Sequence, residues 1–274
     1  MADPTTTVGR TAWRGGRLSD GERVIPEETA VAFTYNGTSY AVMMATPRDL
    51  EDFAVGFSLT ERVVASLDEI ESLEVLDEDI GIELRMRLAG PQAEAFQARR
   101  RFLAGPTGCG LCGIESLAEA VRSPPRVAVA ASFPARDIME AVAALDGRQD
   151  INRATHAVHG AAFWRRGEGL VALREDVGRH NALDKLAGAL GRAGVDTAKG
   201  IGVVTSRLSI EMIQKAAAIG LPVLAAVSAP TALAVRTAQA AGMTLVAVAR
   251  SDGFEIFTHP ERIKEDRSLH VVAG

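Results

Sequence analysis

The sequence predicts an α/β protein, with a C-terminal domain built on a mostly parallel sheet and a smaller α+β domain before it. The main observation is a clean alternation of apolar strands and helices in the last hundred residues: Ile201 to Thr205, Ser209 to Ile219, Val223 to Val227, Thr231 to Ala241 and Leu245 to Ala249. Near-continuous apolar strands that alternate with helices are typical of a parallel sheet covered by helices. The first hundred residues lack this alternation and instead show short strands around one helix.

The N-terminal region begins with about 20 polar, glycine-rich residues, which we expect to be flexible. Regular structure is expected from about Val24. Two apolar stretches, Val31 to Tyr35 and Ser39 to Met44, flank Asn36-Gly37. This dipeptide favours a turn with positive φ, so the segment predicts a β-hairpin.

A helix is predicted to begin at Thr46-Pro47, because Thr46 can cap it and Pro47 fits its first turn. Further elements follow up to the middle of the chain: strands at Glu74 to Leu76 and Ile82 to Leu88, and a helix at Gln92 to Leu103. After Pro125 the expected order is a strand at Val127 to Ala131, a helix at Arg136 to Leu145, a polar link at Gly147 to Arg153, strands at Ala161 to Trp164 and Leu170 to Leu173, and a helix to about Leu190.

These elements predict four parts of the chain. They are a flexible tail (1–20), an α+β N-terminal domain (21–104), a cysteine loop with a short helix (105–125) and an α/β domain (126–274).

Composition narrows the class of protein. Hydrophobic residues make up 47% of the 274 residues and charged residues 24%, which is typical of a folded globular protein. A net charge of -5 argues against a general nucleic-acid binder. We find no secretory signal and no apolar run of about 18 residues, so no membrane span is expected. Two cysteines cannot form a disulfide framework, and a cytoplasmic location is therefore expected.

The only two cysteines, Cys109 and Cys112, lie in a glycine-rich loop from Gly105 to Gly113. A helix is expected directly after them, and a helix N-terminus lowers the pKa of a nearby thiol. The glycines would expose both sulfurs to a bulky partner. The loop therefore indicates reactive cysteines.

A structural zinc site is the alternative for this pair. His156 and His159 could complete a Cys₂His₂ set, or they could be polar residues lining a cleft. The gap between the cysteines and histidines is much longer than in compact zinc modules.

Three loops that follow the predicted parallel strands are the expected ligand site. Arg207 and Ser209 lie in the first of them, where an arginine and the free N–H groups of a helix start favour a phosphate. Ordinary helix capping and a surface arginine are the alternative. Asp176 lies in a charged segment that also offers His180 as a proton carrier, and a carboxylate can accept hydrogen bonds from guanine. An ion-paired turn is the alternative there.

Several motifs together resemble the formate dehydrogenase accessory sulfurtransferase family, FdhD/NarQ, from about Glu28 to Pro260. The motifs are Val42-Met43-Met44-Ala45-Thr46-Pro47, Thr107-Gly108-Cys109-Gly110-Leu111-Cys112-Gly113, Arg174-Glu175-Asp176-Val177-Gly178-Arg179-His180-Asn181-Ala182-Leu183-Asp184-Lys185, Val204-Thr205-Ser206-Arg207-Leu208-Ser209 and Ser228-Ala229-Pro230-Thr231.

The resemblance implies a sulfurtransferase. It would accept sulfur from a cysteine desulfurase as a persulfide on Cys109, with Cys112 as its neighbour, and pass it to the molybdenum cofactor, a bis(molybdopterin guanine dinucleotide), which is its bound substrate. It further implies that formate dehydrogenase is the partner that needs this sulfur transfer, and that the protein is a homodimer. The C-terminal domain is expected to be three-layered and cytidine-deaminase-like, and the protein is expected to have no metal of its own.

The resemblance also places a cofactor-binding stretch on Val248, Ala249, Arg250, Ser251, Asp252 and Gly253. The chain departs from the family here, because a glycine is expected after Arg250 and often a further arginine two positions on. With the loop residues, the predicted cofactor set also includes Asp176, Arg207 and Ser209.

Two other functions remain open from the sequence. A chaperone that docks the cofactor or the apo-dehydrogenase would need the loops but not the cysteines. A zinc deaminase would carry His-x-Glu before Pro-Cys-x-x-Cys, whereas here the histidines follow the cysteines.

Overall fold

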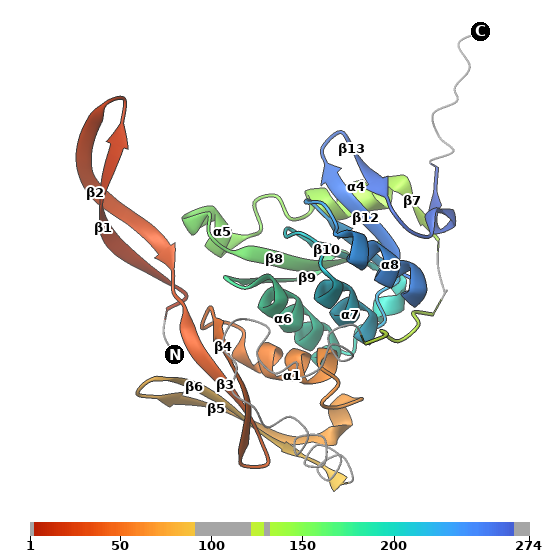
Figure 1. Ribbon diagram of the computed structural model, residues 1–274, viewed down its shortest axis with the longest axis horizontal. Helices are drawn as coiled ribbons and strands as arrows, with labels where there is room; N and C mark the ends of the chain where they lie inside the picture. The colour runs from red at the N-terminus through yellow and green to blue at the C-terminus, as the bar shows by residue number, and fades with distance from the viewer. Residues whose placement is uncertain (1–2, 91–121, 129–131, 266–274) are drawn as a thin grey trace.

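The computed structural model describes residues 3–90, 122–128 and 132–265, and the fold is a mixed α/β arrangement of two main sheets. Figure 1 shows a layer of helices between the N-terminal sheet and the C-terminal sheet. The helix that was expected at Gln92 to Leu103 lies outside the described residues. None of the helices in the described ranges is both long enough and apolar enough to cross a bilayer.

The C-terminal sheet has six strands in the order β13-β12-β11-β10-β8-β9. Its strands are β8 (His159–Arg165), β9 (Gly169–Asp176), β10 (Ile201–Val204), β11 (Val223–Ala226), β12 (Thr244–Arg250) and β13 (Gly253–Ile256). Only β10, β11 and β12 run parallel, while β8, β9 and β13 pair antiparallel. The expectation of a mostly parallel sheet is therefore wrong. Short turns join β8 to β9 and β12 to β13, and a short turn can only connect antiparallel strands.

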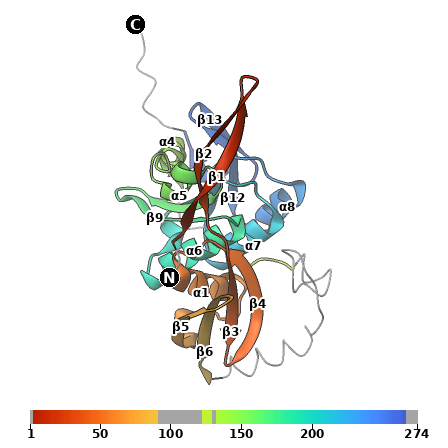
Figure 2. The same ribbon diagram turned by 90° about the vertical axis from the view of Figure 1, so that its left-hand side faces the viewer.

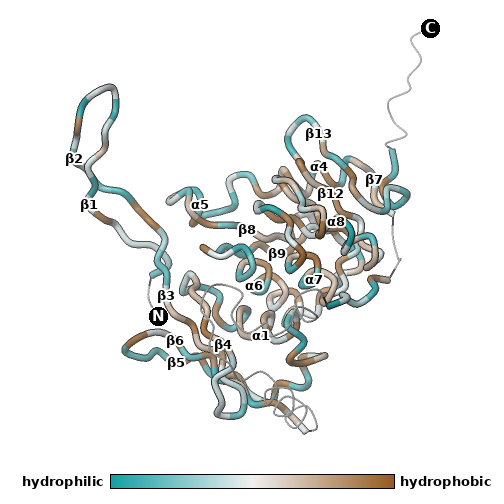
Figure 3. Tube along the Cα trace, viewed as in Figure 1, coloured by the Kyte–Doolittle hydropathy of each residue, from teal (hydrophilic) through white to brown (hydrophobic). Residues whose placement is uncertain are grey.

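Helices cover both faces of the C-terminal sheet, so this part of the chain has three layers. One face packs against α4 (Ala135–Ala143), and the other packs against three helices: α6 (Arg179–Arg192), α7 (Ile210–Ala218) and α8 (Ala232–Ala241). Alternate residues along each strand contribute to the two cores, as Phe163 and Trp164 do on β8. Figure 3 shows the apolar residues concentrated in these strands and the facing sides of the helices.

The N-terminal sheet has four strands in the order β4-β3-β6-β5, with α1 (Leu50–Thr60) against one face. The strands are β3 (Thr29–Tyr35), β4 (Thr38–Ala45), β5 (Ile70–Glu78) and β6 (Gly81–Leu88). The predicted hairpin at Asn36-Gly37 is confirmed, with φ of 49° and 75° at these residues.

The start of α1 differs from the expectation. The helix begins at Leu50 after a left-handed Asp49, not at Thr46-Pro47. The Thr46 hydroxyl accepts a hydrogen bond from the Val177 N–H at 3.2 Å, so it joins two distant segments instead of capping a helix.

Two strands begin before Val24, which corrects the expectation that regular structure begins there. β1 (Thr5–Arg14) and β2 (Arg17–Pro26) pair in full antiparallel register and form a ribbon, here called the N-terminal ribbon. Gly15 and Gly16, with φ of 56° and 79°, form the tight two-residue turn between the strands. The polar residues on either side of this turn do not indicate strands. The ribbon projects from the body of the molecule (Figure 2).

Two segments between the N-terminal and C-terminal sheets also differ from the expected elements. The predicted polar link at Gly147 to Arg153 contains the start of α5 (Asp150–Thr155), whose first N–H groups donate to the Glu175 carboxylate. The described part of the predicted strand at Val127 to Ala131, up to residue 128, is irregular, although the Val127 N–H donates to the Ala241 carbonyl. The short strands β7 (Phe133–Pro134) and β14 (Ile263–Lys264) form a separate parallel pair.

Candidate functional site

One edge of the C-terminal sheet gathers most of the predicted site residues. The parallel strands β10, β11 and β12 all end at this edge. Because β8 is antiparallel to β10 and to β9, the start of β8 and the end of β9 lie at the same edge. The edge therefore joins His159, the first residues of α6 and the loops after β10, β11 and β12, and we call it the ligand edge.

Backbone hydrogen bonds fix the three loops of the ligand edge to one another. The Thr231 N–H donates to the Leu208 carbonyl at 2.9 Å, and the Val248 N–H donates to the Ser228 carbonyl at 3.2 Å. Leu208 also forms an isolated parallel bridge with Pro230. The loops thus form one preorganised surface.

Val248 has a left-handed backbone with φ of 53°, in a strand whose register shifts between Ala247 and Arg250. A β-branched residue adopts this conformation only at a cost, and strain of this kind clusters at functional sites. The bulge lies within the predicted cofactor stretch, and Arg250, Ser251 and Asp252, which follow it, are exposed.

Positive charge converges on the ligand edge. Arg207 and Arg250 are exposed and Arg179 is half-buried, and the guanidinium groups of all three have no hydrogen bond or ion pair within the described ranges. Neither α6 nor α7 has a side-chain cap at its N-terminus, and the N-cap residue of α7 is Ser209. Free N–H groups and the helix dipole favour an anion at such ends. The edge can therefore bind a phosphate-bearing ligand.

The two histidines at the edge are held neutral. Burial, with the positive charge of Arg179, lowers the pKa of His180 to about 4 and the pKa of His159 below its ordinary value. At neutral pH each imidazole keeps a free acceptor nitrogen, which can accept a hydrogen bond from a ligand. Sequence reasoning did not include His159 or Arg179 in the cofactor set. The signal that could have placed them was the antiparallel direction of β8 and β9.

Asp176 is buried and paired within the chain. Its side chain is fully buried, and Oδ2 accepts hydrogen bonds from Lys185 Nζ at 2.6 Å and the Thr46 N–H at 3.0 Å. Oδ1 accepts from the Gly178 N–H and the Asn181 amide. All of its acceptor positions are occupied, so the carboxylate holds the start of α6 against the N-terminal sheet, as the ion-paired alternative expected.

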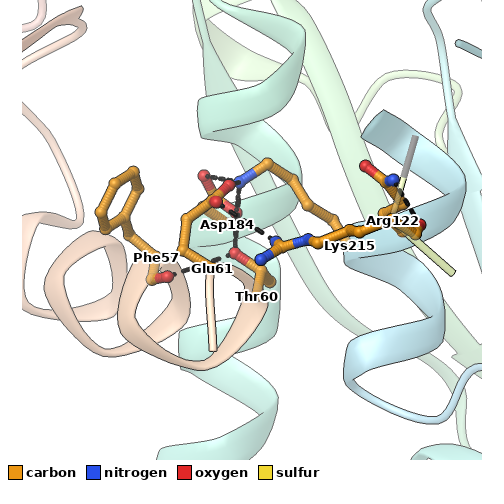
Figure 4. Close-up of polar contacts among 7 residues, drawn as sticks. Phe57, Thr60, Glu61, Arg122, Asp184 and Lys215 are labelled. Atoms are coloured by element: carbon orange, nitrogen blue, oxygen red, sulfur yellow. Dashed lines mark hydrogen bonds and ion pairs between the residues drawn. The ribbon is translucent and has the colours of Figure 1, made fainter. Parts of the chain in front are cut away.

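A second buried ionic cluster, at Lys215, joins α1, α6 and α7 (Figure 4). Lys215 Nζ donates to both Asp184 oxygens at 2.9 and 3.0 Å, to Glu61 at 2.7 Å and to Thr60 at 3.2 Å. Glu61 also lies 3.4 Å from the guanidinium of Arg122. The cluster therefore ties Arg122 to the C-terminal end of α1.

Cys109 and Cys112 lie outside the described residues. The Arg122 carbonyl accepts a hydrogen bond from Gln214 at 2.9 Å, on the second turn of α7. Arg122 lies ten positions after Cys112 in the chain. His156, the other histidine considered for zinc, is exposed at the end of α5. Among the described residues, no three His, Cys, Asp or Glu side chains are grouped for a metal ion.

The geometry defines an α/β protein with a rigid, cationic edge suited to a phosphate-bearing ligand. The FdhD/NarQ family matches residues 26–264 of the chain. The chain is 56% identical over 257 residues to the sulfur carrier protein FdhD of Agrobacterium fabrum, covering 93% of this chain and 95% of that protein. It is 48% identical over 271 residues to the sulfur carrier protein FdhD of Cupriavidus necator, covering 98% and 94%.

A solved structure agrees with these matches. The crystal structure of a proposed formate dehydrogenase accessory protein from Desulfotalea psychrophila is similar over 96% of this chain and 100% of that chain, with a TM-score of 0.76 and 25% identity. The chain belongs to the FdhD/NarQ family.

Proposed function

We propose that the protein is a sulfur carrier that accepts sulfur from a cysteine desulfurase as a persulfide on Cys109. It passes this sulfur to the molybdenum cofactor, a bis(molybdopterin guanine dinucleotide), for use by formate dehydrogenase. The proposal includes a cytoplasmic location, a homodimer and a cytidine-deaminase-like C-terminal domain. The curated relatives are sulfur carriers, and the solved neighbour is a proposed formate dehydrogenase accessory protein.

One observation of the structure supports this proposal most directly. Three arginines without partners among the described residues and two uncapped helix N-termini meet at the ligand edge. This edge suits the diphosphate of a guanine dinucleotide, with Arg179, Arg207 and Arg250 as cations and Ser209 at the start of α7. In this proposal Asp176 does not contact the cofactor. It stabilises the start of α6 through its hydrogen bonds to Lys185 and Asn181.

The sulfur chemistry needs only thiolates and a reductant. The Cys109 thiolate attacks the outer sulfur of the donor persulfide, and the donor cysteine leaves as a thiolate. Attack of the Cys112 thiolate on the inner sulfur of the Cys109 persulfide would release the outer sulfur as sulfide for the cofactor. The Cys109–Cys112 disulfide that remains would then be reduced by a cellular thiol.

Persulfide formation is tested by intact-protein mass spectrometry after incubation with a cysteine desulfurase and cysteine. We expect a gain of one sulfur atom that is lost with reductant and is absent in Cys109→Ala. Cys112→Ala is expected to gain the sulfur but release it slowly. No gain in the wild-type protein, together with stoichiometric zinc, would contradict the carrier and support the metal site. Normal dehydrogenase maturation by Cys109→Ala would instead support the chaperone.

Ligand binding at the edge is tested separately, with GDP as the probe. We expect Arg207→Ala and Arg179→Ala each to weaken GDP binding about tenfold or more, because a charge-assisted hydrogen bond contributes roughly 1.5–3 kcal/mol. Arg153→Ala, an exposed arginine of α5 with a local ion pair to Asp150, is the control and should bind normally. Calorimetry gives the affinities. Unchanged affinity in both edge variants would place the nucleotide elsewhere.

A further inference from the structure

We propose that the N-terminal ribbon is an arm by which two copies of this chain hold each other. Its arginine-bearing face would lie on the acidic tip of the other copy, which we define as residues 77–80, the end of β5 and the turn into β6. This inference rests on the homodimer of the proposed function and supplies the interface for it.

The ribbon separates its charges onto two faces. Successive side chains of a strand point to opposite faces, and the register sets Arg14 opposite Arg17 and Val8 opposite Arg23. One face therefore carries all four arginines of the ribbon: Arg10, Arg14, Arg17 and Arg23. The other face carries both of its acids, Asp20 and Glu22. Such a segregated face is suited to an anionic surface.

The arginine face has little to bind within its own chain. All four arginines are exposed. Arg23 donates to the Thr155 carbonyl at 3.1 Å, and no carboxylate in the described residues forms an ion pair with Arg10, Arg14 or Arg17. Like charges that lie directly opposite each other on two strands are destabilising, as Arg14 and Arg17 do here. An acidic partner would convert this repulsion into attraction.

The end of the ribbon is also apolar. Trp13 and Leu18 lie directly opposite each other beside the turn, and they are 71% and 72% exposed. An isolated two-stranded ribbon is only marginally stable in water. Apart from Ala12, the half-buried residues of this ribbon lie at its base, at Thr5 and Val24 to Pro26. Trp13 and Leu18 both lie on the face of the ribbon that carries Asp20 and Glu22, and not on the arginine face.

The chain itself offers the complementary surface. The acidic tip has three consecutive acids, Asp77, Glu78 and Asp79, followed by Ile80, which is 93% exposed. The tip thus carries a charge opposite to that of the arginine face. The charge balance of the whole chain agrees. The ribbon has four arginines and two acids, a net charge of +2, so the rest of the chain carries -7 of the total of -5.

The positions of the two features permit a closed pair. The ribbon and the β5–β6 tip lie on the same side of the molecule at opposite ends, as both views show (Figures 1 and 2). A two-fold axis passing between them would place each ribbon against the tip of the other copy. Such an isologous contact closes on itself and makes a dimer instead of a filament.

Charge reversal with full-length protein tests the interface. Light scattering should show a wild-type dimer of twice 28.9 kDa, weakened by salt. We expect the ribbon variant Arg10→Glu/Arg14→Glu/Arg17→Glu and the tip variant Glu78→Lys/Asp79→Lys each to raise the dimer dissociation constant at least about tenfold. Arg236→Glu on exposed α8 is the control and should remain dimeric.

Mixing the two variants gives the decisive result. In a mixed pair the glutamates of one ribbon meet the lysines of the other tip, and the unchanged ribbon meets the unchanged tip. We therefore expect heterodimers to form from two monomeric proteins. Homodimers that persist in both variants, or mixed proteins that stay apart, would overturn the interface while leaving the homodimer itself possible.

Two other results separate this inference from the proposed function. A monomeric wild-type protein that still gains persulfide sulfur would overturn the homodimer and this interface but not the sulfur carrier. Variants that stay dimeric but no longer accept sulfur from a desulfurase would assign the arginine face to the desulfurase and contradict the arm.

Discussion

Replacing either Gly56 or Gly188 with alanine is expected to destabilise the protein by about 3 kcal/mol or more. These glycines lie where α1 crosses α6. A Cβ atom added to Gly56 would sit 1.7 Å from the Asp184 carbonyl oxygen, and one added to Gly188 would sit 1.9 Å from the Asp52 carbonyl oxygen. The atoms that block each methyl group belong to the backbone, so the two helices would have to separate.

Separation of the helices would have consequences beyond the two methyl groups. The same interface holds hydrogen bonds from Arg192 to Asp52 at 2.7 Å and from Thr60 to Asp184 at 2.6 Å. Each of these buried or half-buried contacts depends on the spacing of α1 and α6. Their loss would add to the steric cost.

Gly191→Ala is the matched control, since Gly191 lies on the same helix. The atoms nearest to its added Cβ would be Cδ1 of Leu67 and Cδ1 of Leu59, at 3.1 and 3.3 Å, which are ends of flexible side chains. Alanine also favours a helix over glycine by about 1 kcal/mol. Urea unfolding should therefore show a change within about 1 kcal/mol. Equal losses at Gly56, Gly188 and Gly191 would contradict the close backbone contact.

The elements best predicted from the sequence are those with local signals. The strands and helices from Ile201 to Ala249 follow from apolar runs of strand and helix length, and the hairpin at Asn36-Gly37 follows from its turn residues. The pairing of β8 with β10 and the glycine contact between α1 and α6 depend on segments far apart in the chain. No local pattern reports them.

In the candidate site, too, the positions of residues with a local sequence signal were predicted correctly, and those of residues that depend on distant contacts were not. Arg207 and Ser209 were predicted at a strand end and lie there, because the strand–loop–helix alternation fixes their position. Asp176 was predicted at the ligand but forms a buried pair with Lys185 nine residues later. Charge density alone does not distinguish a ligand site from a buried ion pair, since both need clustered charges. The polar ribbon was expected to be flexible because its strands carry almost no apolar alternation.

Lys215→Met is expected to destabilise the protein by about 3–5 kcal/mol at pH 8, because it leaves buried carboxylates without their cation. Burial acts to lower the pKa of Lys215, but Asp184 and Glu61 together raise it above its ordinary value, so the amine is charged in the native protein. Burial raises the pKa of Asp184 to about 6, against the opposing attraction of Lys215. Removing the amine removes that opposition and should raise the pKa of Asp184 further.

The pH dependence follows from the sign of this shift. A carboxyl group whose pKa is higher in the folded state than in the unfolded state binds a proton on folding, so stability falls as pH rises between the two values. In the wild-type protein, the decrease in stability that Asp184 causes as pH rises ends near pH 6, the folded-state pKa of this residue. In Lys215→Met it should continue above pH 6, so the destabilisation should be smaller at pH 6 than at pH 8. Denaturant unfolding at both values measures the difference.

Two further variants test whether the effect of Lys215→Met comes from the buried charges of the cluster. Lys199→Met removes an exposed lysine that lies 3.0 Å from Asp196, and it should change stability by less than about 1 kcal/mol at every pH. Lys215→Met/Asp184→Asn removes the buried charge together with its partner, and it should recover stability and lose the added pH dependence. A loss in Lys215→Met that does not vary with pH would mean that Asp184 keeps its proton affinity without the amine. In that case the three helices would depend on the packing of the Lys215 side chain and not on its charge.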